Sequence, residues 1–127
     1  MTMKTIILKK NEERRLLAGH LWVYSNEIDT KITKLRDFEP GELVYIKNSQ
    51  NKNLGLGYIN PHTLLCVRLL TRDTNQMINR EFFVTKIQQA LLLRQACFTK
   101  PFYRLIFSES DYLSGLVVDR FDDVLVA

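Results

Sequence analysis

The chain has 127 residues, 46% hydrophobic and 25% charged, which suits one globular domain, or one small domain and part of another. No apolar run approaches the ~20 residues that cross a bilayer, and the N-terminus does not resemble a signal peptide. Cys66 and Cys97 supply neither a disulfide framework nor metal-site spacing. Both lie in apolar segments, where we expect buried, inert thiols. These features indicate a reducing, cytoplasmic setting and no membrane partner.

The positive charge is unevenly distributed along the chain. Residues 1–72 contain 12 Lys and Arg against 7 Asp and Glu, whereas residues 73–127 contain 6 against 7. A basic first part joined to a near-neutral second part predicts a polyanionic partner for the first part.

Residues 12–28 carry the most informative pattern of the chain. After a first strand at Thr5–Leu8, two acids and two arginines lead into Leu16, Leu17 and Ala18, which predicts a short helix with acids at its N-terminal end. Gly19 is placed to end this helix. The aromatic and β-branched residues of His20–Ser25 then predict a strand.

This stretch brings Arg14 and Arg15 close to His20, Trp22 and Tyr24. Cations beside flat rings are what RNA requires, since the charges bind phosphate and the rings stack on exposed bases. Besides this RNA-binding interpretation, a second one stays open at this point. In the second interpretation, the rings face a core and the arginines lie in an ordinary solvated turn.

The next segments alternate between turns and strands. Asn26–Glu39 predicts a loop with a short strand around Ile32, and Glu42–Lys47 predicts a central strand. In the strand Leu54–Ile59, Gly55 and Gly57 share one face. Bare backbone there favours close packing of another element over the approach of a ligand.

The strand Leu64–Leu70 follows the turn at residues 60–63, with Arg68 on a face that is not wholly buried. Five or six short strands and one early helix within residues 1–73 predict a small, twisted, partly closed β-barrel. The expected fold class is therefore mixed α/β, with this barrel first and an incomplete α+β domain at residues 74–127.

In the second part, Asn79 is positioned to cap a long helix that ends near Cys97. Its expected core stripe consists of Phe83, Ile87, Ala90, Leu91 and Arg94. Strands are predicted at residues 102–108 and 116–121, and another begins at Val124–Ala127. Because the chain stops inside this apolar run, we expect it to be part of a longer protein.

Four motifs in the first part carry a resemblance to a known family. They are R-R-L-L-x-G-H-x-W-V-Y-S-x-E-I from Arg14, P-G-E-L-V around Gly41, G-x-G-Y-x-N-P-H-T from Gly55 and V-R-L-L-T from Val67. Together they resemble the PUA domain at the front of the S-adenosylmethionine-dependent methyltransferases that make 5-methylcytosine in large-subunit ribosomal RNA. E-S-D-x-L-x-G-L-V-V-D-R-F-x-D from Glu109 resembles the linker domain that follows there. Leu21 stands where that family usually has proline. Tyr112, Ser114 and Asp122 stand where it usually has glycine, proline and glycine, respectively.

The resemblance implies that this chain binds and positions structured, ribosomal RNA without modifying it. The implied catalytic domain, with S-adenosylmethionine and a cysteine nucleophile for cytosine C6, would follow residue 127. We therefore assign no catalytic, cofactor or metal residue here. The candidate RNA-binding residues are Lys9, Arg14, Arg15, His20, Trp22, Tyr24 and Arg68.

Two alternatives come from other classes of protein. A self-contained, metal-dependent hydrolase would use the carboxylates of Glu109, Asp111, Asp119, Asp122 and Asp123, although such residues are more often turn formers. A stand-alone interaction domain would pair the exposed strand Val124–Ala127 with another chain, including a second copy in a homodimer.

Overall fold

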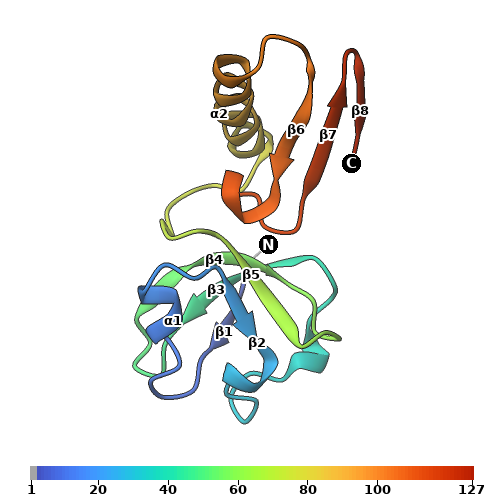
Figure 1. The fold of residues 1–127 in the computed structure, drawn as a ribbon. Coiled ribbons are helices and arrows are strands. Elements are labelled where there is room, and N and C mark those ends of the chain that lie inside the picture. The colour runs from blue at the N-terminus through green and yellow to red at the C-terminus, as the bar shows by residue number, and fades with distance from the viewer. Residues whose placement is uncertain (1–2) are drawn as a thin grey trace. The chain divides into compact units, whose positions relative to one another are not determined.

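The computed structural model describes residues 3–127 and divides into two compact units, the first ending at Gln76 and the second spanning Met77–Ala127 (Figure 1). The mixed α/β class is confirmed, because the described residues form a five-stranded sheet, a three-stranded sheet and one long helix. No described helix has the length and apolarity needed to span a bilayer.

The first unit is built on a five-stranded mixed sheet with the order β1-β3-β4-β5-β2. β1 pairs parallel with β3, and the other neighbours are antiparallel. The strand order has two edges, so the strands of the described chain do not form a closed barrel. A single bridge between Leu8 and Ile28 lies outside the named strands. The strands are β1 (Lys4–Ile7), β2 (Trp22–Tyr24), β3 (Glu42–Lys47), β4 (Asn53–Ile59) and β5 (Leu65–Thr71).

The segments around β2 are shorter than the sequence predicts. The helix α1 (Arg14–Leu17) has no acidic residue in its first turn, and the 3-10 helix η1 (Ser25–Glu27) ends the aromatic strand after Tyr24. The prediction of a strand around Ile32 is wrong. This residue lies exposed in a loop that leads to a second 3-10 helix, η2 (Leu35–Asp37).

Most of the core of the first unit lies on one face of its sheet. Ile6, Val44, Ile46, Ile59 and Val67 are fully buried there. Alternation between buried and partly exposed positions along β3 follows from the two-residue period of a strand. β4 and β5 approach closely at the two glycines, as the close-packing interpretation predicts. A Cβ on Gly55 would lie 2.4 Å from the carbonyl oxygen of Thr71.

The second unit consists of the helix α2 (Arg80–Cys97) and the antiparallel sheet β6-β7-β8. The side chain of Asn79 caps α2 as expected, accepting a hydrogen bond of 3.0 Å from the amide of Phe82. Ala90 is buried against Leu105 and Ile106 of β6. The prediction that Phe83 belongs to the core stripe of this helix is wrong, because Phe83 is 38% exposed while its neighbour Phe82 is buried. The strands are β6 (Phe102–Phe107), β7 (Val117–Phe121) and β8 (Val124–Val126), and a 3-10 helix, η3 (Ser108–Asp111), follows β6.

The two cysteines differ in accessibility, which corrects the expectation that both are buried. Cys66 is buried in β5, and burial raises the pKa of its thiol to about 11. Cys97 is exposed at the end of α2. We expect a maleimide at pH 7 to label Cys97 rapidly and Cys66 only after unfolding, because the thiolate is the reactive species and Cys66 is both inaccessible and protonated. Peptide mass spectrometry checks this, and rapid native labelling of Cys66 would contradict its burial.

Candidate nucleic-acid interface

The strand β2 carries two aromatic side chains that are partly exposed. Val23 is 1% exposed, whereas Trp22 and Tyr24 on either side of it are partly exposed. Successive side chains of a strand point to opposite faces, so the burial of Val23 directs the Trp22 ring to the other face. A register shift after Val23 breaks this alternation at Tyr24. Neither ring is fully buried, unlike the core residue between them.

Register brings two further residues beside Trp22. Arg68 of β5 is the direct partner of Trp22 on β2 and of Tyr58 on β4. The guanidinium carbon of Arg68 lies 6.0 Å from the centroid of the Trp22 ring, within range for a cation–π interaction. Trp22, Arg68 and Tyr58 thus form a line across three neighbouring strands, which we call the sheet-face row.

A second cation–aromatic pair joins α1 to β2. The guanidinium of Arg15 lies 5.0 Å from the centroid of the Tyr24 ring. Its Nη1 is also 3.8 Å from the carboxylate of Glu27, which is buried and accepts a hydrogen bond of 2.7 Å from the amide of Tyr24. The charge of Arg15 is therefore partly compensated within the protein.

Three other predicted cations and rings are placed differently. Lys9, Arg14 and His20 are exposed. In the described part of the chain, no hydrogen bond, ion pair or ring contact joins their side chains to the sheet-face row or to Arg15. Lys9 and Arg14 are thus available to solvent and to a polyanion.

Sequence reasoning missed Tyr58 and Arg72. Tyr58 follows Gly57, but its position beside Arg68 depends on the pairing of β4 with β5. Arg72 donates from Nη1 to the carbonyl oxygen of Leu16 at 2.6 Å and from Nη2 to that of His20 at 3.1 Å. It caps the end of α1. Pairing the two strand predictions across the turn at residues 60–63 was the signal that could have found Tyr58.

The acidic residues of the second unit do not converge. Asp111 accepts a hydrogen bond of 2.7 Å from Arg94, Asp119 is bound by Arg104, and Glu109 accepts one from Ser114. Among the described residues, no group of three or more His, Cys, Asp or Glu side chains could hold a metal ion. The described residues therefore offer no metal site for the hydrolase alternative.

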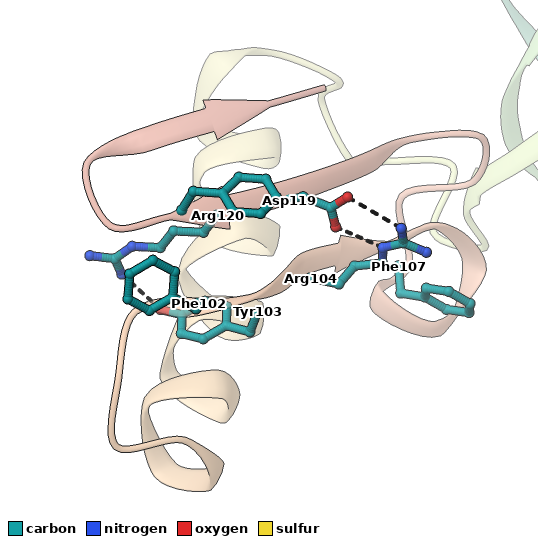
Figure 2. Close-up of a pocket in the computed structure, with 7 residues that line it drawn as sticks. Phe102, Tyr103, Arg104, Phe107, Asp119 and Arg120 are labelled. Atoms are coloured by element: carbon teal, nitrogen blue, oxygen red, sulfur yellow. Dashed lines mark hydrogen bonds and ion pairs between the residues drawn. The ribbon is translucent and has the colours of Figure 1, made fainter.

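A shallow groove of about 600 Å³ runs along β6 and β7 of the second unit. Figure 2 shows Arg104 and Asp119 facing each other there, joined by hydrogen bonds of 2.8 and 3.2 Å. These bonds lower the pKa of Asp119. Arg120 donates to the hydroxyl of Tyr103 at 2.7 Å. The charge of Arg104 is thus compensated by Asp119, whereas Arg120 donates to a neutral hydroxyl.

A comparison with known protein families gives a match to the first unit. The profile of the PUA-like domain family matches residues 6–72, which hold the sheet-face row and the Arg15–Tyr24 pair. The chain belongs to the PUA-like domain family. The first unit is thus a PUA-like domain, as the sequence motifs indicate.

Relatives of this PUA-like chain extend the similarity through the second unit. Ribosomal RNA large subunit methyltransferase I of Tolumonas auensis is 36% identical over 125 residues, covering 96% of this chain and 31% of the relative. The enzyme of the same name from Shewanella denitrificans is 37% identical over 128 residues, covering 95% and 31%. The chain therefore spans about 31% of the length of these curated relatives and corresponds to their N-terminal part.

Solved structures share the fold of the PUA-like chain. A putative SAM-dependent methyltransferase from Streptococcus mutans matches with a TM-score of 0.78 at 17% identity, covering 97% of this chain and 32% of the other. A putative methyltransferase complexed with SAH gives the same TM-score and identity, covering 97% and 31%.

Proposed function

We propose that this chain is the RNA-binding and positioning part of a SAM-dependent methyltransferase that modifies cytosine C5 in large-subunit ribosomal RNA. The observation that carries the proposal is the pairing of cations with rings in the PUA-like unit, Arg15 with Tyr24 and Arg68 with Trp22. The names of the relatives support the choice of ribosomal RNA as the ligand.

In this proposal the unit supplies two kinds of contact. Exposed cations such as Lys9 and Arg14 bind phosphates, and these contacts release counterions, so affinity falls steeply as salt rises. Partly exposed rings contact bases that are not stacked in a helix. The chain holds the RNA, and the chemistry occurs in another part of the protein.

The residues described here do not fit S-adenosylmethionine. A nucleotide-like cofactor is typically held by a glycine-rich turn between a strand and a helix. Neither connection from a strand to a helix, at residues 8–13 and 72–79, contains a glycine. Cys66 is also unsuited to attack C6 of cytosine, because its thiol is buried and its pKa is raised to about 11. Cofactor and nucleophile would belong to the rest of a full-length protein.

We expect the double substitution Lys9→Glu with Arg14→Glu to weaken binding of large-subunit ribosomal RNA fragments at least about 10-fold at 0.1 M salt. The slope of log affinity against log salt should fall by roughly 1.5, because two phosphate contacts are lost. Both residues are exposed, so circular dichroism should show an unchanged fold. Arg15 is left intact because an acid there would face the buried Glu27.

The matched control makes the same charge change in the second unit, at Arg80 and Lys100, which are also exposed. A loss of affinity confined to the Lys9/Arg14 variant supports the PUA-like unit as the RNA-binding part. Equal affinity of this variant and the unmodified chain would refute the role of this basic surface.

A further inference from the structure

We infer that the loop between β2 and β3 carries a phosphate-binding site for the RNA backbone, formed by Lys34 and Arg36, two cations that line a shallow groove. A phosphodiester group would occupy the groove, and the RNA strand that carries it would run beside β1 toward Lys9. The inference rests on the proposed RNA-binding function and adds a second contact surface to it.

The loop covers the free edge of β1. This strand pairs with β3 on one side only, so it lies at an edge of the sheet. On its other side the amide of Asp29 donates to the carbonyl oxygen of Ile7 at 2.9 Å, and the amide of Ile7 donates to the hydroxyl of Thr33 at 3.1 Å. Nζ of Lys4 donates to the carbonyl oxygen of Asp37. The loop therefore runs antiparallel to β1 and is held to it at both ends.

The cations of this loop are presented to solvent. Residues 30–36 contain Lys31, Lys34 and Arg36 and no acid, and all three cations are exposed. Thr33, which lies among them, is 4% exposed. Within the part of the chain that the structure describes, no hydrogen bond or ion pair holds the side chains of the three cations. The loop is thus fixed from beneath, and its positive charges face outward without a direct partner.

The acids nearest to these cations do not neutralise them directly. The carboxylate of Asp29 accepts a hydrogen bond of 3.1 Å from the amide of Lys31. The carboxylate of Glu42 lies 3.4 Å from Nζ of Lys4. Asp37 is exposed, and among the described residues it forms no ion pair with either cation of the groove. The local charge therefore favours an anion.

The chemistry of the groove matches a phosphate group. The groove measures about 420 Å³ and is lined by Thr30, Lys34, Leu35 and Arg36. Hydroxyl, ammonium and guanidinium groups all donate hydrogen bonds to anionic oxygens, and the planar fork of an arginine fits two phosphate oxygens at once. A base would require an aromatic surface to stack on, and the lining contains none. Contact at the groove is thus with the backbone and carries no base preference.

The position of the groove connects it to the basic residues of the proposed function. The amide of Lys9 donates to the carbonyl oxygen of Glu27 at 2.9 Å, so Lys9 lies where the loop begins. Arg36 precedes Asp37, whose carbonyl oxygen contacts Lys4 at the other end of β1. The segment from Lys4 to Lys9 spans roughly 17 Å at the rise of a strand. One RNA strand along this edge would therefore place several phosphates beside cations.

We expect Lys34→Glu with Arg36→Glu to weaken binding of large-subunit ribosomal RNA fragments at least about 10-fold at 0.1 M salt. The slope of log affinity against log salt should fall by roughly 1.5, because two phosphate contacts are lost. Adding Lys9→Glu and Arg14→Glu should lower the slope by roughly 3 in total, since separate contacts add. Arg36→Gln introduces no acid and should alone lower it by roughly 0.8. Fluorescence anisotropy at several salt concentrations measures affinity, and circular dichroism checks the fold.

The exchange of Lys34→Arg with Arg36→Lys is the matched control. It keeps both charges and should leave affinity within about 2-fold. A loss as large as that of the charge reversal would show that charge is not what the groove contributes, and would overturn the site.

The outcomes separate the inference from the proposed function. If the Lys9/Arg14 variant loses affinity while every Lys34/Arg36 variant binds RNA like the unmodified chain, the groove is no RNA contact and the proposed function stands. Unchanged RNA affinity with lost binding of polyglutamate would overturn the inference in favour of an acidic protein partner. No affinity of the unmodified chain for any ribosomal RNA fragment would overturn both.

Discussion

Replacing Gly57 with alanine is expected to destabilise the PUA-like unit by about 3 kcal/mol or more, the upper end of overpacking costs. The new Cβ would lie 2.3 Å from the carbonyl oxygen of Arg68 and 3.0 Å from its carbonyl carbon. Both are backbone atoms, so no side-chain rotation relieves the clash, and β4 must separate from β5. Urea unfolding followed by the fluorescence of Trp22, which lies in the same unit, measures the loss.

Gly41→Ala is the matched control. Gly41 has a φ of +85°, which disfavours alanine, but nothing lies within 4 Å of the added Cβ. The Gly41→Ala variant should therefore be destabilised only by the conformational cost, roughly 1–2 kcal/mol. If Gly57→Ala costs no more than Gly41→Ala, close contact between the two strands is not what the glycine provides.

The strands with a clear period were predictable from the sequence. β3 has the expected bounds, β4 begins one residue earlier than expected, and β5 is shifted by one residue. Each runs for six or seven residues between strong turn formers, so local pattern suffices to locate it. The two glycines of β4 also predict their close packing, since bare backbone on one face has few other uses.

Where prediction failed, side chains replaced the hydrogen bonds of a strand. The carboxylate of Glu27 accepts from the amide of Tyr24, and the aromatic strand ends there. Near the absent strand at Ile32, the hydroxyl of Thr33 accepts from the amide of Ile7 at 3.1 Å. The first of these contacts is local and the second joins segments 26 residues apart, and neither leaves a periodic signal in the sequence. The sheet-face row shows the same limit, because the position of Tyr58 beside Arg68 depends on register rather than on spacing.

Two residues of the second unit that depart from the family pattern share an unusual backbone conformation. Tyr112 and Asp122 stand where the resembling family usually has glycine, and their φ angles are +61° and +56°. Both positions lie in the left-handed region, which glycine adopts without strain. The backbone conformation that favours glycine is thus retained although the glycines are replaced.

Asp111→Ala is expected to cost the second unit about 3–5 kcal/mol, the loss typical of breaking a buried ion pair. Asp111 is 8% exposed and its carboxylate accepts two hydrogen bonds of 2.7 Å, from Nη2 of Arg94 and from the amide of Phe107. Removing it leaves a largely buried guanidinium without its anion and a backbone donor without an acceptor. Hydrogen exchange of the amides in α2 and β6 measures the loss within this unit, where Trp22 does not report.

Asp119→Ala is the control, because Asp119 also pairs with an arginine in the same unit but lies nearer the surface. The side chains of Arg104 and Asp119 are 46% and 32% exposed, against 14% and 6% for Arg94 and Asp111. Water replaces the lost partner at the exposed pair, so its loss should be much smaller. Adding Arg94→Met to Asp111→Ala should restore part of the stability, since no uncompensated charge then remains buried. Equal losses for the two aspartate variants would show that burial does not determine the strength of these pairs.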